Sequence, residues 1–341
     1  MITEKDIRSA KKCGDIFTND KNIAKAEYRE LARRYHPDIH SGNGELMTKI
    51  NSLYQRAMSL FENGNGNWEA SDQVSLVSSA GEILVFSYLA KKSFELGVLY
   101  ICETEVVYVL DASHEKYFQN AKGKIGSLQY ANDAMKNEVG RYMPKIKRTN
   151  RLKDGRWCIV FHKAEDFYSL EDLVKYFGGA VPPKHAAWMI SRLCNICCYL
   201  DYLGLAHNGI GMGNCFVSPK THVIALLGGW WYCAEQEKSM MGTQKAIYDV
   251  MPPKEKSQKL ATIVTDLESV KLIGRQILGN VSLFASAKND ANIPEAILKF
   301  LRSGSSERAV DEFEKWNGAL IEAFGRPRFI ELNIEKSDIY K

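Results

Sequence analysis

The chain has 341 residues, and its 45 Lys and Arg residues against 41 Asp and Glu residues give a formal net charge of +4. A hydrophobic content of 45% allows a sizeable core, and the length favours one small and one large domain. The N-terminal residues include no apolar stretch of the kind found in signal peptides. Arg192 and Asp201 interrupt the longest apolar region before it reaches the length of a membrane span. We therefore expect a soluble, cytoplasmic protein with no membrane contact. The eight cysteines are then expected to be reduced thiols.

Two amphipathic segments near the N-terminus flank the tripeptide His36-Pro37-Asp38. Pro37 disfavours helical dihedral angles at His36, so the first helix is expected to end there and to leave the tripeptide in an exposed loop. Apolar residues at helical spacing predict that the two segments pack against each other. These residues are Ile23, Leu31 and Tyr35 before the loop, with Tyr28 at the edge of their stripe, and Leu46, Ile50, Leu53, Tyr54 and Ala57 after it.

The stretch from Tyr28 to Asp38, followed by Lys49-Ile-Asn-Ser-Leu-Tyr54, resembles the J-domain of DnaJ-type co-chaperones over about residues 1–61. The resemblance implies that the loop and the basic face of the preceding helix bind a DnaK-type ATPase chaperone and stimulate its ATP hydrolysis. A basic run of this kind is also typical of a solvated helix face that binds nothing. The tripeptide directly after it favours binding of the chaperone. The residues implied at the contact are His36, Pro37, Asp38, Lys25, Tyr28, Arg29, Arg33 and Arg34.

Residues 62–80 are rich in Gly, Asn and Ser and are expected to form a linker. Beyond the linker we expect strands at 94–99 and 105–110, one helix at 130–143, and a hairpin of 145–151 with 156–161 around Asp154-Gly155. Helices are predicted at about 182–204, 261–278, 294–302 and 307–324. Together with the N-terminal helical hairpin, this order predicts an α+β protein rather than a doubly wound sheet.

The segment from Leu205 to Val217 resembles the catalytic loop of protein kinases, His-Arg-Asp followed by a metal-binding Asn. The resemblance covers about residues 81–331, implies a two-lobed kinase-like domain, and leaves residues 332–341 as a C-terminal tail. At the family's functional positions this chain has His207 at the His, Gly209 at the catalytic Asp, Asn214 at the metal-binding Asn, Gly228 at the Asp of Asp-Phe-Gly, Glu138 at the small-lobe helix Glu and Asp266 at the buried large-lobe Asp.

The chain therefore lacks several charged groups on which kinase catalysis depends. Gly209 cannot orient a hydroxyl, Gly228 cannot hold a metal, and Val107-Tyr-Val-Leu110 offers no phosphate-binding Lys. We expect a pseudokinase with no catalytic residue and no nucleotide or metal cofactor. Trp230 and Trp231 beside Gly228 are either packed in the core or available to a partner in the vacated cleft.

Two other site hypotheses arise from residue clusters. Cys194, Cys197 and Cys198 have half of a zinc-site spacing, but they lie in an apolar helical pattern where cysteine serves as a small hydrophobic residue. The segment from Arg141 to Arg156 is rich in Lys and Arg, which is compatible with nucleic-acid binding but favours a solvated face.

The favoured interpretation is an adaptor that joins a J-domain to a kinase-like module binding a client protein. One alternative is an atypical kinase or nucleotidyl-transferring enzyme that uses displaced carboxylates such as Asp201 or Glu235. The other is a nucleic-acid-associated factor that uses the basic hairpin.

Overall fold

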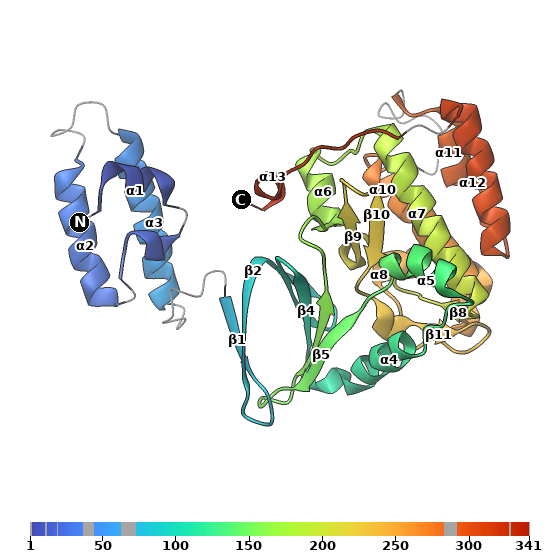
Figure 1. Cartoon of the computed structure of the whole chain (residues 1–341), viewed down its shortest axis with the longest axis horizontal. Coiled ribbons are helices and arrows are strands. Elements are labelled where there is room, and N and C mark those ends of the chain that lie inside the picture. The colour runs from blue at the N-terminus through green and yellow to red at the C-terminus, as the bar shows by residue number, and fades with distance from the viewer. Residues whose placement is uncertain are drawn as a thin grey trace. The chain divides into compact units, whose positions relative to one another are not determined.

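The computed structural model describes residues 2–10, 12–18, 20–36, 44–62, 73–282, 292–326 and 329–340. The chain folds as an α+β protein in two compact units, one formed by residues 1–76 and 83–88 and the other by 77–82 and 89–341 (Figure 1). None of the helices in the described ranges is long and apolar enough to cross a membrane.

The first unit is built on three helices, α1 (Glu4–Ser9), α2 (Lys21–Arg34) and α3 (Gly44–Glu62), with a short 3-10 turn, η1 (Cys13–Asp15), between α1 and α2. The Thr3 side chain caps α1 and the Asp20 carboxylate caps α2 by accepting hydrogen bonds from backbone N–H groups that the helix itself leaves unpaired. The helices enclose a core of their own, made by Ile7, Ala10, Cys13, Ile16, Phe17, Ala24, Leu31, Tyr35, Leu46, Ile50, Leu53 and Ala57.

Two of the three residues in the predicted apolar stripe of α2 are buried, and at the third position the neighbouring residue is buried instead. Ile23 is 48% exposed, whereas Ala24 is buried with Leu31 and Tyr35. Residues 24, 31 and 35 are seven and four apart, so they lie on one helical face, and a methyl group at residue 24 is enough where α3 approaches closely. The predicted apolar positions Leu46, Ile50, Leu53 and Ala57 of α3 are buried.

A six-stranded sheet follows, with the strand order β1-β2-β3-β4-β6-β5. An isolated bridge between Ser78 and Leu152 links the ends of the two edge strands, so the sheet curls (Figure 1). The strands are β1 (Gln73–Val77), β2 (Ile83–Phe94), β3 (Gly97–Cys102), β4 (Glu105–Leu110), β5 (Ile146–Arg151) and β6 (Trp157–His162).

Strands β4, β5 and β6 lie where the sequence predicts them, but two expectations for the earlier part of the sheet are wrong. The predicted strand 94–99 spans the turn between β2 and β3, where Gly97 has φ +155 and its Cα lies against the backbone of Val109. The predicted linker 62–80 contains β1, whose polar and half-buried residues give little strand signal.

The helix predicted at 130–143 is also wrong in its bounds. The main helix between β4 and β5 is α4 (Glu115–Gly126), preceded by η3 (Ala112–His114), and only α5 (Asp133–Val139) and the 3-10 turn η4 (Gly140–Tyr142) occupy the predicted range. Helix α4 buries Phe118, Ala121 and Ile125, a pattern that two glycines and several lysines obscure in the sequence.

The rest of the chain is mostly helical. Short strands β7 (Tyr168–Ser169), β8 (Leu205–Ala206), β9 (Cys215–Ser218), β10 (Val223–Leu226) and β11 (Ala234–Glu235) lie among the helices with the 3-10 turns η5 (Met212–Asn214) and η6 (Trp230–Tyr232). The helices are α6 (Leu170–Tyr176), α7 (Pro183–Tyr202), α8 (Lys245–Val250), α9 (Pro253–Gln258), α10 (Ile263–Ile277), α11 (Glu295–Arg302), α12 (Ala309–Phe324) and α13 (Lys336–Ile339).

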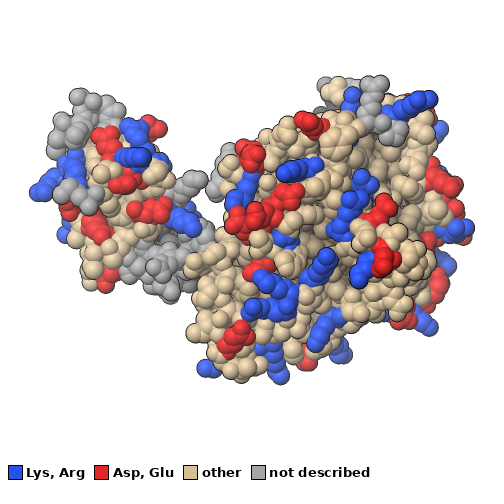
Figure 2. All heavy atoms as spheres, in the orientation of Figure 1, with Lys and Arg blue, Asp and Glu red and all other residues tan. Residues whose placement is uncertain are grey.

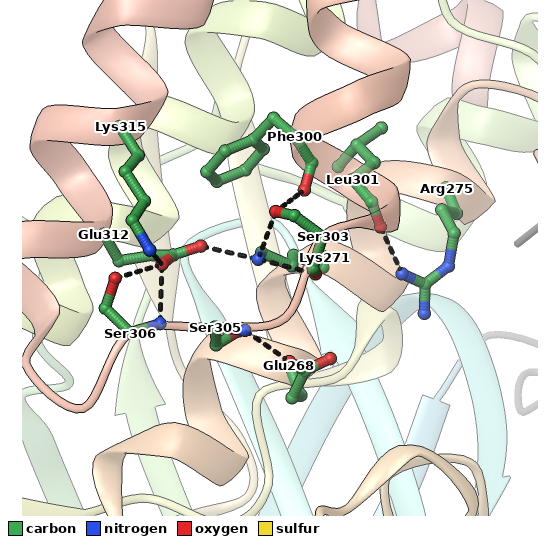
Figure 3. A network of polar contacts seen from close by, with 10 residues as sticks. All are labelled: Glu268, Lys271, Arg275, Phe300, Leu301, Ser303, Ser305, Ser306, Glu312 and Lys315. Atoms are coloured by element: carbon green, nitrogen blue, oxygen red, sulfur yellow. Dashed lines mark hydrogen bonds and ion pairs between the residues drawn. The ribbon is translucent and has the colours of Figure 1, made fainter.

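A buried ion pair joins α10 to α12. The Lys271 ammonium lies 2.7 Å from the Glu312 carboxylate, and both side chains are 1% exposed (Figure 3). Lys271 also donates to the carbonyl of Ser303, while Glu312 accepts hydrogen bonds from the backbone and hydroxyl of Ser306. Burial raises the pKa of Glu312, but the hydrogen bonds from Lys271 and Ser306 outweigh it and hold the pKa below its usual value.

Candidate functional site

The first candidate surface is the exposed side of α2 and its C-terminal end. Arg29 and Arg33 are exposed, Lys25 is half-buried, and His36 is exposed as the last described residue before the loop. The spacing of four residues places Lys25, Arg29 and Arg33 on one helical face, as expected. Pro37 and Asp38 lie outside the described residues.

Two side chains expected at this surface instead pack within the helical unit. Tyr28 stacks on Tyr54 with 3.9 Å between ring centroids, and its hydroxyl donates to Asn51. Arg34 pairs with Glu30 and donates to the backbone carbonyl of Ile2. Their contacts are therefore intramolecular, which limits the exposed basic face to Lys25, Arg29 and Arg33.

The second candidate region is the loop that follows β8, which Asp266 holds from the first turn of α10. Its two carboxylate oxygens accept hydrogen bonds from the backbone N–H groups of His207 at 2.6 Å and Asn208 at 2.8 Å. Burial raises the pKa of Asp266 to about 7, although both hydrogen bonds favour the charged form. The carboxylate thus fixes the loop backbone, as expected for the buried Asp that the sequence identifies.

His207 is enclosed in the core and has a structural setting. Its imidazole meets the indole of Trp230 edge to face at 4.8 Å, and neither ring nitrogen has a hydrogen-bond partner within the described part of the chain. Burial lowers the pKa of His207 to about 3, so the ring is neutral at physiological pH. The neutral His207 side chain thus packs against Trp230 in the core of the second unit.

The glycines of this region are required by close contacts with neighbouring backbone and side-chain atoms. A Cβ at Gly209 would lie 2.9 Å from the carbonyl oxygen of Gly229, and one at Gly228 would overlap both the Asn214 amide and the Tyr108 hydroxyl. Asn214 itself donates to the Gly209 carbonyl at 2.8 Å. The positions that lack a carboxylate are therefore also positions without space for one.

An aromatic cluster that the sequence does not reveal fills the space beside these glycines. Tyr108 in β4 and Phe94 in β2 both pack against Trp231, with ring centroids 5.0 Å and 5.1 Å from it. The Tyr108 hydroxyl is buried without a hydrogen-bond partner among the described residues, and burial raises its pKa. The continuous apolar run of β4 marks Tyr108 as a core residue but not as a neighbour of Gly228, which lies 120 residues later.

Two further contacts hold the sheet against the helical region. The Lys92 ammonium in β2 lies 3.0 Å from Glu171 and 2.8 Å from Asp172 at the start of α6. Asn120 in α4 donates to the backbone carbonyls of Trp231 and Cys233. These cross-links come from polar residues that carry no recognisable motif.

Three expected site residues have other roles in the structure. Trp230 and Trp231 are 0% and 1% exposed, and the Trp230 indole donates to the Leu226 carbonyl. Of the two alternatives for these indoles, the structure has the first, because core packing covers both. Glu138 is exposed on α5, whereas the helix that packs against η6 is α4, which corrects the position expected for a small-lobe glutamate.

Three of the seven basic residues between Arg141 and Arg156 form ion pairs. Lys147 pairs with Glu105, Arg148 with Glu82 and Arg156 with Asp154. Figure 2 shows Lys and Arg side chains with Asp and Glu among them on the face that carries β4 and β5. An interrupted positive field of this kind lacks the continuous basic stripe that is typical of phosphate-backbone binding.

Within the described ranges, no group of three or more His, Cys, Asp or Glu side chains is arranged to hold a metal ion. Cys194 and Cys197 are buried in α7, and burial raises the pKa of each thiol. Comparison of the sequence with protein-family models and with curated proteins found no match.

Proposed function

We propose that this protein is a co-chaperone of two parts: an N-terminal J-domain that recruits and stimulates a DnaK-type ATPase chaperone, and a kinase-like module that binds a client or partner protein. The observation that carries the proposal is the helical hairpin of α2 and α3, which shares one core with α1 and η1 and leaves His36 exposed just after α2. Arg29 and Arg33 beside it offer the positive face that steers an acidic partner.

The kinase-like part of the proposal is supported by the order of elements in the second unit. A curled antiparallel sheet holds α4 between β4 and β5 and is followed by a mostly helical region. The loop after β8 is anchored through its backbone by the carboxylate at the start of α10. Fold similarity of this kind supports an architecture but not an activity.

The second unit acts as a binding module rather than a phosphotransferase. Phosphoryl transfer depends on carboxylates that hold magnesium and on a cation at the phosphates. In this chain Gly209 and Gly228 have no space for carboxylates, and Tyr108 and Trp231 fill the adjoining volume. Lys92, a cation that enters from the sheet, is already paired with Glu171 and Asp172.

The test is single-turnover ATP hydrolysis by a DnaK-type chaperone with the full-length protein or a variant. His36→Gln should abolish stimulation and leave the circular dichroism spectrum unchanged, because His36 is exposed at the end of α2. His114→Gln, the same replacement in the second unit, is the matched control. Equal stimulation by the wild type and His36→Gln would overturn the assignment.

A further arm tests the basic face. Reversing Arg29 and Arg33 to Glu should weaken stimulation most at low salt, since exposed charges act over about 8 Å at physiological ionic strength. Lys122→Glu with Lys153→Glu makes the same charge change in the second unit and should have little effect. If the two pairs behave alike, net charge rather than this helix face governs the contact.

A further inference from the structure

A pocket of about 670 Å³ lies in the second unit, beside the segment that follows β6 and leads to the helical region. Its walls come from η4 and the residue that follows it, from the end of β6 and the segment after it, and from β10. The volume lies within the usual range for small-molecule sites, roughly 300–1,000 Å³. The sequence motifs do not point to it, because its residues come from segments far apart in the chain, from Thr104 to Leu227.

The pocket has a rigid side formed around Lys163. This ammonium is buried and donates to three backbone carbonyls, those of Glu103 at 2.7 Å, Ala164 at 3.0 Å and Phe167 at 3.1 Å. An ammonium has three donors, so Lys163 has none left for a ligand. It instead fixes the backbone around the pocket, which lets the site keep its shape without a bound molecule.

Three other basic side chains line the pocket and face solvent: Arg141, Lys145 and His162. The backbone N–H of His162 donates to the carbonyl of Lys145, which places these two residues next to each other. The Arg141 guanidinium is held by the Glu138 carbonyl and the Tyr142 hydroxyl. Among the described residues neither Arg141 nor Lys145 forms an ion pair, in contrast to Lys147 and Arg148 on the adjoining strand.

The remaining wall is mainly apolar and includes Met143, Phe167, Ala225 and Leu227. Glu165 also lines the pocket, but it lies close enough to Lys163 and Lys336 to interact electrostatically with both. The pocket is thus lined by more basic than acidic side chains, next to an apolar surface. Such a combination selects a molecule with one anionic end and one apolar body.

We infer that this pocket binds a small amphipathic anion, a ring or short hydrocarbon carrying a carboxylate, sulfonate or phosphate. The anionic group is held by Arg141 and Lys145, and the apolar body lies against Met143 and Leu227. This binding site is separate from the chaperone-facing surface of the first unit and extends the proposed function. Its ligand would lie beside the segment that connects the sheet to the helical region.

The test uses two fluorescent probes on the full-length protein: anilinonaphthalene sulfonate, which is an aromatic anion, and the uncharged phenylnaphthylamine, which has the same apolar body. The sulfonate should bind with a stoichiometry of one and about tenfold or more tighter than the uncharged probe, because a charge-assisted contact contributes at least about 1.5 kcal/mol. Arg141→Glu with Lys145→Glu should weaken sulfonate binding by a similar factor.

Lys122→Glu with Lys153→Glu is the matched control, since both lysines are exposed and neither lines the pocket. Thr104→Trp places an indole at the exposed rim without entering the core and should block the sulfonate. Equal affinity for the two probes, equal effects of the two charge reversals, or unimpaired binding by folded Thr104→Trp would each overturn the inference.

Discussion

At the residue scale, the glycines beside the loop that Asp266 holds lie where neighbouring atoms leave no space for a side chain. Gly228 permits the Asn214 amide and the Tyr108 hydroxyl to approach its Cα. Neighbouring side chains thus occupy the space that a side chain at this position would need. The small residue and the close packing around it are therefore one feature of the molecule.

This close packing predicts that Gly228→Ala destabilises the fold. Overpacking in a filled core typically costs about 1–3 kcal/mol in the free energy of unfolding. Gly123→Ala in the exposed middle of α4, where an added methyl meets nothing within 4 Å, should instead stabilise by up to about 1 kcal/mol. Urea denaturation of both variants measures the difference, and equal stability would show that the region is loosely packed.

His207 and Asp266 predict opposite dependences of stability on pH. The pKa of His207 falls to about 3 from 6.5 on folding, so the unfolded state binds more protons and this residue makes stability rise with pH in that interval. The pKa of Asp266 rises to about 7 from 3.8, so the folded state binds more protons and this residue makes stability fall with pH in that interval.

The two effects oppose each other between about pH 4 and pH 6.5, and single variants should separate them. Stability of His207→Phe should fall more steeply with pH than that of the wild type, and stability of Asp266→Asn should rise more steeply. The double variant should return to the wild-type slope. Unfolding free energies at several pH values are the measurement, and unchanged slopes in both single variants would contradict the assigned burial.

At the element scale, the Lys271–Glu312 pair determines how α10 and α12 meet. Removal of one partner leaves a buried charge, so Lys271→Met should destabilise by about 3–5 kcal/mol. Lys271→Met with Glu312→Leu should recover most of this loss, because neither charge then remains. The exposed pair of Lys245 and Asp249 on α8 is the control and should contribute only about 0.3–0.5 kcal/mol.

A double-mutant cycle with chemical denaturation measures both couplings. A coupling for Lys271 and Glu312 as small as that of the surface pair would mean that water reaches the network. The contacts in Figure 3 argue otherwise, since Ser303 and Ser306 supply the remaining hydrogen bonds of the two charged groups.

At the scale of the whole molecule, the C-terminal segment is part of the second unit rather than a separate tail. Helix α13, dark red in Figure 1, contacts α6. Leu332, Ile334, Ile339 and Tyr340 pack against the core, and the Tyr340 hydroxyl accepts a hydrogen bond from the Ser169 backbone N–H. Lys336 pairs with Glu103 in the turn between β3 and β4.

The separate cores predict that the two parts of the chain fold independently. A fragment of residues 1–62 contains the complete helical core and should unfold cooperatively and stimulate the chaperone. A fragment of residues 73–341 should fold without stimulating it. Thermal unfolding and single-turnover hydrolysis test both. A helical fragment that folds but does not stimulate the chaperone would place part of the contact in the second unit.

Local pattern in the sequence determined the longer elements. The helices α7, α10, α11 and α12, the strands β4, β5 and β6, and the buried faces of α2 and α3 follow from periodicity and from Pro and Gly at element ends. The residues at the exposed end of α2 and the Asp that opens α10 were identifiable in the same way, because short motifs mark them.

Only the tertiary structure decided what surrounds those motifs. The burial of Trp230 and Trp231, the overlap of Tyr108 with the space at Gly228, and the meeting of Arg141, Lys145 and Leu227 in one pocket depend on contacts between segments far apart in the chain. Periodicity indicates that a side chain is buried but not which side chain it meets. The sequence therefore determined the elements, and packing decided that aromatic side chains fill the space beside Gly228.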